Sequence, residues 1–178
     1  MLSRNFAAVA ASHLTLSRGC AFWIENASLP PLRTSQARAV FARLSGNRLR
    51  ELDGFLNHLL ADILAAISAP PDNALQGERA KSTLRRLHAV EAHLNLNFDV
   101  EVRLIALART ITALRRPAGQ THLQRFHRDL QVATGLPQNS ELRFPEALDD
   151  AAVLSICSFY QLLGNSLVIA HANHANRG

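Results

Sequence analysis

Basic residues crowd into one segment of the chain. Between Arg103 and Arg128 there are six arginines and two histidines but no acidic residue. Within it, Arg109, Thr112 and Arg116 recur at the i, i+3, i+7 spacing that places side chains on one face of a helix. Guanidinium groups bind phosphates through paired hydrogen bonds, so arginines on one face can contact a nucleic-acid backbone. We therefore predict a polyanion-binding surface made by the following residues: Arg103, Arg109, Arg115, Arg125, His127 and Arg128.

The same charges also have a purely structural explanation. Arg115 and Arg116 directly precede Pro117, which predicts a helix end, where cations interact favourably with the helix dipole. A second acid-free stretch, from Arg33 to Arg50, holds five more arginines. The net charge is +5, yet only one of the 19 basic residues is a lysine, so a compositional preference for arginine produces the same excess. Basic charge alone therefore permits phosphate binding without requiring it.

Histidines and acids do not combine into a metal site. His88 and Glu91 are spaced i, i+3 and can share a helix face, but His93 points elsewhere. His171 and His174 have the same spacing without an acidic partner. The chain contains no Glu-x-x-His, phosphate-binding glycine loop, nucleophile elbow or His-Glu-x-x-His motif. We predict no metal and no cofactor.

A further pattern involves the predicted helix end. Arg116 is followed by Pro-Ala-Gly-Gln-Thr and then His122, an Arg-x5-His spacing, and the preceding "FDVEVRLIALARTITALRR" mixes leucine with arginine. Over about 40 residues the chain resembles the HEPN family (higher eukaryotes and prokaryotes nucleotide-binding). Members of that family are all-helical and usually dimeric, and its ribonucleases carry Arg-x(4–6)-His near the end of a core helix.

The resemblance implies a function as well as a fold. In a metal-independent endoribonuclease of this type, Arg116 would stabilise the scissile phosphate and His122 would act as acid, base or orienting group at a dimer cleft. The 2′-hydroxyl of the RNA would attack the neighbouring phosphate. The implied assembly is a homodimer.

Helices must position all of these residues. Apolar residues make up 48% of the chain but aromatic residues only 6%, and no stretch alternates as a β-strand would. We predict an all-α bundle of five or six helices, with residues 34–178 forming a single domain. Residues 1–33 are expected to form an N-terminal arm with at most one short helix, around residues 6–16. The expected helices of the bundle cover residues 34–44, 49–67, 78–94, 98–116, 121–134 and 145–172.

Turn and capping residues set these boundaries. We expect Ser45-Gly46-Asn47 to interrupt one helix, Asn97 to cap another, and Gly164 to bend the last. Thr121 with Gln124 forms a capping-box pattern. Gly135 is expected at a helix C-terminus.

We interpret the chain as a helical binding module whose arginine-rich face contacts RNA or another polyanion. The alternatives are the HEPN-type nuclease, helix-turn-helix DNA binding, a protein-interaction module with incidental charge, and a small-molecule pocket. Whether it is an enzyme is left open. No run approaches the 18 to 20 apolar residues of a membrane span, so we expect a cytoplasmic protein without a membrane partner. Cys157, in an apolar stretch, is expected to be a buried thiol.

Overall fold

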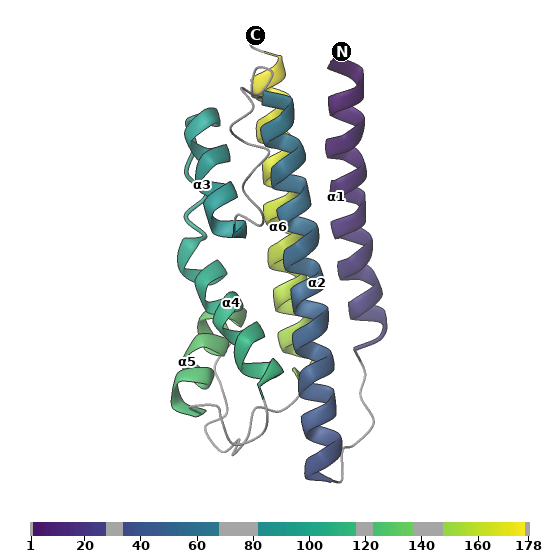
Figure 1. Cartoon of the computed structure of the whole chain (residues 1–178), viewed down its shortest axis with the longest axis vertical. Coiled ribbons are helices and arrows are strands. Elements are labelled where there is room, and N and C mark those ends of the chain that lie inside the picture. Colours follow the sequence, from purple (N-terminus) through teal and green to yellow (C-terminus); the bar gives the residue numbers. More distant parts are fainter. Residues whose placement is uncertain (1, 28–33, 68–81, 117–122, 137–147, 177–178) are drawn as a thin grey trace. The chain divides into compact units, whose positions relative to one another are not determined.

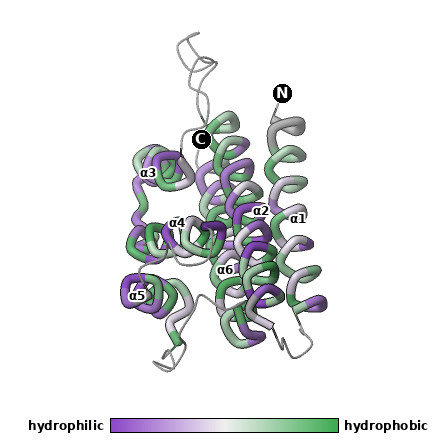
Figure 2. The backbone as a smooth tube through the Cα atoms, turned by 60° about the horizontal axis from the view of Figure 1, so that its bottom comes forward, coloured by the Kyte–Doolittle hydropathy of each residue, from purple (hydrophilic) through white to green (hydrophobic). Residues whose placement is uncertain are grey.

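The structure is a computed structural model that describes residues 2–27, 34–67, 82–116, 123–136 and 148–176. All regular structure in these ranges is helical (Figure 1), which confirms the predicted all-α bundle. Figure 2 shows hydrophobic and hydrophilic residues interspersed along the helices, as expected where each helix buries one side. The helices are α1 (Leu2–Glu25), α2 (Ser35–Ile67), α3 (Thr83–Leu94), α4 (Glu101–Arg115), α5 (Leu123–Thr134) and α6 (Asp150–Ala175).

The chain divides into two compact units, each described here by itself. Unit 1 comprises Met1–Cys20, Leu52–Phe98 and Tyr160–Gly178, and unit 2 comprises Ala21–Glu51 and Asp99–Phe159. Helices α1, α2 and α6 therefore contribute residues to both units. The expected single domain over residues 34–178 remains a prediction.

Unit 1 packs parts of α1, α2 and α6 together with α3. Its core is mostly aliphatic and includes the fully buried Tyr160, and α6 continues through Gly164 without ending. A Cβ on Gly164 would lie 3.0 Å from Leu16 Cδ2, so this glycine lets α6 approach α1 closely. The fully buried side chains of unit 1 include Leu16, Leu52, Leu56, Leu59, Leu60, Ile63, Leu87 and Tyr160.

Unit 2 packs the end of α1 and the first part of α2 with α4, α5 and the start of α6. Cys157 is completely buried, as expected, and Cys20 of unit 1 is a second buried thiol. The buried apolar residues of unit 2 include Trp23, Leu49, Leu104, Leu107, Leu114, Phe126, Leu130 and Ile156.

Two N-terminal boundaries differ from expectation. The short helix expected around residues 6–16 is the 24-residue α1, which continues through Gly19 to Glu25. The interruption expected at residues 45–47 is absent, because α2 is one helix of 33 residues. Gly46 lies inside it, where it accommodates α4 as described below.

The residues that cap α3 and the start of α4 are Ser82, Asn95 and Val100. The Ser82 side chain accepts a hydrogen bond from the Arg85 N–H and so caps α3. Asn95 ends α3 with a left-handed φ of 52°. The prediction that Asn97 caps the next helix was wrong, since the N-cap of α4 is Val100.

Later boundaries agree better with expectation. Helix α4 ends at Arg115, before Pro117, and Gly135 follows α5 with a φ of 68°, both as expected. The capping box at Thr121 and the helix start near Pro145 lie outside the described residues. In the described part, Asp149 accepts a hydrogen bond from the Ala152 N–H at 2.7 Å at the start of α6.

Helix α6 also corrects the expectation about apolar runs. By length and composition it could cross a membrane. Half of its most apolar stretch is buried inside the protein, and core helices pass the same test. Composition therefore does not assign α6 to a membrane.

Candidate polyanion-binding surface

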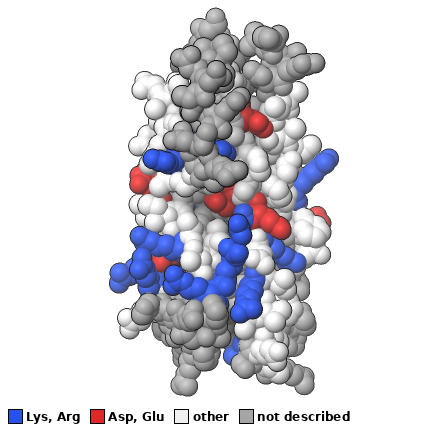
Figure 3. Space-filling model, viewed as in Figure 1, with Lys and Arg blue, Asp and Glu red and all other residues white. Residues whose placement is uncertain are grey.

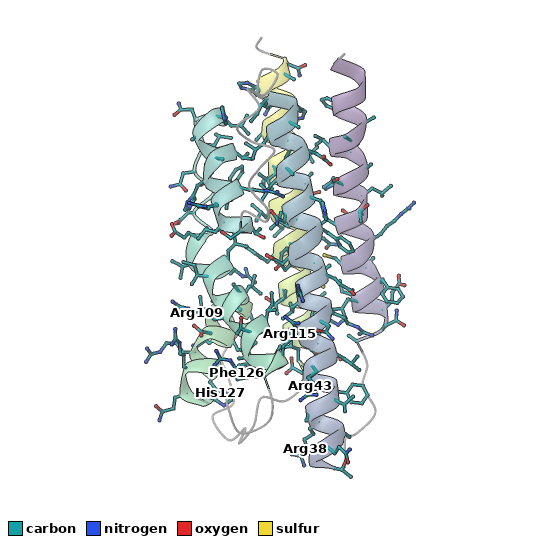
Figure 4. All side chains as sticks on the ribbon, viewed as in Figure 1. Arg38, Arg43, Arg109, Arg115, Phe126 and His127 are labelled. Carbon is teal, nitrogen blue, oxygen red and sulfur yellow. The ribbon has the colours of Figure 1, made fainter. Side chains whose placement is uncertain are left out.

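The two acid-free arginine segments of the sequence meet in unit 2. At their meeting point, a Cβ on Gly46 would lie 2.8 Å from Arg115 Cγ and 3.0 Å from Leu114 Cβ. Arg115 Nε also donates a hydrogen bond to Asn47 Oδ1 at 3.2 Å. Arg43 lies one helical turn from Gly46 on α2, and Figure 4 shows it near Arg115. This contact places arginines from residues 33–50 beside arginines from residues 103–128.

Helix α5 adds further arginines through a shared carboxylate. Arg109 Nη1 of α4 lies 3.5 Å from Asp129 Oδ1, and Arg125 Nε lies 3.9 Å from Asp129 Oδ2. The Asp129 side chain is only 12% exposed, whereas the two arginine side chains are 52% and 67% exposed. One largely buried carboxylate thus lies beside two guanidinium groups that remain accessible from solvent.

Arg116 and Arg128 are also exposed. Arg116 caps the C-terminus of α4, where its N–H donates to the Ala113 carbonyl oxygen at 3.2 Å. Figure 3 shows basic side chains gathered over α4, α5 and the first part of α2. We call the following exposed residues of unit 2 the basic surface: Arg43, Arg109, Arg115, Arg116, Arg125 and Arg128.

Arg103, one of the residues predicted for this surface, points inward instead. Its Nε donates to the Ala133 carbonyl oxygen at 2.8 Å, and its Nη2 donates to Ser155 Oγ at 3.1 Å. The guanidinium carbon lies 4.3 Å from the centre of the Phe159 ring. Burial lowers the pKa of Arg103. Arg103 therefore joins α4 to α5 and α6, and we leave it out of the basic surface.

His127 was also predicted for this surface. It is half-buried, and its ring contacts the Phe126 ring edge-on at 5.7 Å, so we leave it out of the basic surface. His122 lies outside the described residues, so the structure gives no geometry for the Arg116–His122 pair.

The metal-ligand spacing at His88 and Glu91 has another explanation. Glu91 Oε1 accepts a hydrogen bond from the Phe98 N–H at 2.9 Å, which secures the segment that follows α3. No group of three or more His, Cys, Asp or Glu side chains that could hold a metal ion occurs in the described ranges.

Neither Arg43 nor Asp129 was assigned to this region from the sequence. Arg43 belongs to an acid-free segment that was recognised, but the helix break expected at residues 45–47 gave no reason to place it beside α4. Asp129 follows Arg125 at the i, i+4 spacing of helical ion pairs, which could have identified it.

Comparison of the chain with protein-family models, with curated proteins and with solved structures finds no match in any of the three. The HEPN resemblance therefore remains a prediction.

Proposed function

We propose that this protein binds the phosphate backbone of RNA through the basic surface. The observation that supports this most strongly is the contact of Gly46 and Asn47 with Arg115. It brings together two arginine segments that are far apart in sequence and that lack acidic residues. Charge concentrated in this way attracts polyanions more strongly than the same arginines scattered over the protein.

The side chains of the surface suit phosphate better than bases. The arginine side chains of the basic surface are exposed, so their guanidinium groups can pair with phosphate oxygens. Phe126 of α5 is only 3% exposed and offers no face for a base to stack on, and the His127 ring beside it is half-buried. The proposed binding is therefore electrostatic and independent of base sequence.

Salt dependence tests this proposal directly. Binding of a fluorescein-labelled single-stranded RNA of mixed sequence is followed by fluorescence anisotropy from 25 to 200 mM salt. If six arginines each neutralise one phosphate, the slope of log K against log salt is about −4. Absence of binding at 25 mM salt, or a slope near zero, would contradict the proposal. If heparin displaces the RNA at similar concentrations, the proposed partner becomes any polyanion and not RNA specifically.

The nuclease alternative has its own measurement. The binding proposal predicts that the wild-type protein and the His122→Ala variant leave the same RNA intact during incubation in EDTA. Cleavage by the wild-type protein that is lost in His122→Ala would replace the binding proposal with the HEPN-type reaction.

A further inference from the structure

Unit 2 contains a small cavity where α2 meets residues of α1 and α6. Its volume is about 30 Å³, and every residue that lines it belongs to this unit. A space of about 10–15 Å³ suffices for one water molecule. The cavity therefore has room for a chemical group of about two or three heavy atoms, which is the size of a carboxylate.

Two polar side chains that line the cavity are almost completely buried. Ser45 of α2 is 7% exposed and Trp23 of α1 is 3% exposed. Within the described residues, no hydrogen bond joins the Ser45 hydroxyl or the Trp23 indole N–H to another protein group. Buried donors in folded proteins are nearly always paired, so these two donors indicate an acceptor that occupies the cavity.

Arg48 adds a positive charge to the same cavity. Its side chain is half-buried, and its Nη1 donates a hydrogen bond to the Asn26 carbonyl oxygen at 3.4 Å. The Asn26 N–H donates to the Trp23 carbonyl oxygen at 3.2 Å, so Arg48 is held beside the end of α1. Glu25 and Glu51, the acidic residues nearest in sequence to Asn26 and Arg48, are exposed, and in the described part of the chain neither forms an ion pair with Arg48. The guanidinium charge is therefore available to an anion.

The remaining walls of the cavity are apolar. Phe41 and Leu44 of α2 and Val153 of α6 line it beside the three donors. Leu44 is 45% exposed, and Val40, one helical turn earlier on α2, is 50% exposed. An apolar strip therefore leads from the cavity to the surface, and a hydrocarbon chain that covers it removes apolar area from water.

We propose that this cavity binds the carboxylate of a small aliphatic acid. Arg48, Ser45 and Trp23 donate hydrogen bonds to the carboxylate oxygens, which have about four acceptor positions in all. The hydrocarbon chain lies over Leu44 and Val40. We call Trp23, Ser45 and Arg48 the carboxylate site.

Size and charge favour a carboxylate over other occupants. A phosphate group is larger than the cavity, which argues against the RNA backbone as its ligand. Water molecules alone would satisfy the donors but would leave the Arg48 charge without an anion. Arg48 lies outside the basic surface, so this proposal does not depend on RNA binding.

Trp23 is the only tryptophan in the chain, so its fluorescence reports on the carboxylate site. We expect sodium butyrate to change the Trp23 emission with half-saturation at about 1–10 mM, as suits a ligand of so few atoms. Butyramide has a similar shape without the charge and should bind at least about 10-fold more weakly. Saturation-transfer NMR on the butyrate methyl protons measures the same binding without relying on fluorescence.

Variants of the carboxylate site separate its charge from its shape. Arg48→Gln keeps a donor and removes the charge, so it should raise the butyrate dissociation constant at least about 10-fold and leave that of butyramide within about two-fold. Ser45→Ala removes one donor and should raise the butyrate constant about three- to ten-fold. The matched control is Arg50→Gln, because Arg50 is exposed on the same helix and does not line the cavity. Circular dichroism should show unchanged helix content in all three variants.

A small peptide distinguishes two sources of the carboxylate. N-acetyl-alanyl-valine ends in a free carboxylate, and either this peptide or butyrate should bind in a manner that Arg48→Gln weakens. The tighter ligand of the two identifies the source as a peptide C-terminus or a free acid.

Several outcomes would overturn the proposal. One is no response of either measurement to about 50 mM butyrate or peptide, and another is an equal response to butyramide. Equal loss of butyrate binding in Arg50→Gln would do the same. A Trp23 response to inorganic phosphate or RNA, but not to butyrate, that Arg48→Gln abolishes would assign the cavity to phosphate instead. RNA binding is measured separately by anisotropy, and butyrate should leave it unchanged, so either proposal can fail alone.

Discussion

Gly46 of α2 lies directly against Arg115 of α4, with no room for a side chain between the two helices. A Cβ at position 46 would stand 3.0 Å from Leu114 Cβ, which is anchored to the α4 backbone and cannot swing aside as the end of a long side chain can. Arg115 is further held by its hydrogen bond to Asn47. This contact determines how the two arginine segments are joined.

Enlarging residue 46 should separate the two helices. Gly46→Leu is expected to lower the free energy of unfolding by about 1–3 kcal/mol, because the new side chain overpacks the contact. RNA affinity should fall as well, since the basic surface depends on this contact. Thermal melts and the anisotropy assay provide the two measurements.

The same helix offers a matched control. A Cβ on Gly54 would meet nothing within 4 Å. Gly54→Ala should therefore stabilise the protein by up to about 1 kcal/mol through helix propensity and leave RNA affinity unchanged. A Gly46→Leu variant as stable as wild type would mean that the α2–α4 contact is not as tight as described. Destabilisation by Gly54→Ala would contradict the open space found at position 54.

Asp129→Asn should move stability and affinity in opposite directions. Losing the carboxylate beside Arg109 and Arg125 is expected to lower the free energy of unfolding by about 0.5–1 kcal/mol, because the two arginine side chains are more than half exposed and solvent screens the interaction. Removing the negative charge should strengthen RNA binding about two- to five-fold at low salt. Weaker binding by a folded Asp129→Asn would show that orientation of these arginines matters more than their charge.

Asp53 of unit 1 should make stability depend on pH. Burial raises the pKa of this carboxyl above its ordinary value of 3.8, although a hydrogen bond donated by Thr83 Oγ1 partly opposes the shift. The folded state therefore binds this proton more tightly than the unfolded state, and stability is lost as the pH rises from about 4 through the raised pKa. Asp53→Asn does not ionise, so its Tm should match wild type near pH 4 and exceed it by about 1–3 °C at pH 7.

Thr83 provides the control for that titration. Thr83→Val removes the donor, so it should destabilise wild type more at pH 7 than at pH 4, and it should lose this pH dependence in the Asp53→Asn background. A Tm difference between Asp53→Asn and wild type that stays constant from pH 4 to pH 7 would exclude the proposed role of Asp53.

Helices with strong apolar periodicity were predictable from sequence, and so were the ends where proline or glycine leaves little choice. Helix α4 ends at Arg115, two positions before a proline in the sequence, and Gly135 follows α5, because backbone chemistry alone favours those ends. The sequence Ser45-Gly46-Asn47 resembles a break equally well, yet there the glycine serves a contact with residues about 70 positions away. This contact belongs to the tertiary structure, so it cannot be predicted from a local sequence pattern.

The candidate site was predictable only in part for the same reason. Arg103 and Arg109 look alike in sequence, six residues apart on one helix. In the structure Arg103 donates to Ala133 and Ser155, whereas Arg109 lies at the surface beside Asp129. Which arginine faces inward depends on where α5 and α6 pack, so the sequence could identify the basic helix but not each exposed donor.

The most direct test of the central claim compares two double charge reversals in the RNA anisotropy assay at low salt. Arg43→Glu with Arg116→Glu alters the basic surface from both of its segments, whereas Arg18→Glu with Arg85→Glu makes the same charge change at exposed residues of unit 1. The account predicts that the first pair weakens binding at least about 30-fold and makes the salt slope about 1.4 units shallower, while the second stays within about three-fold of wild type. Equal losses in the two pairs would show that RNA responds to net charge alone, and would contradict a surface built where α2 and α4 meet.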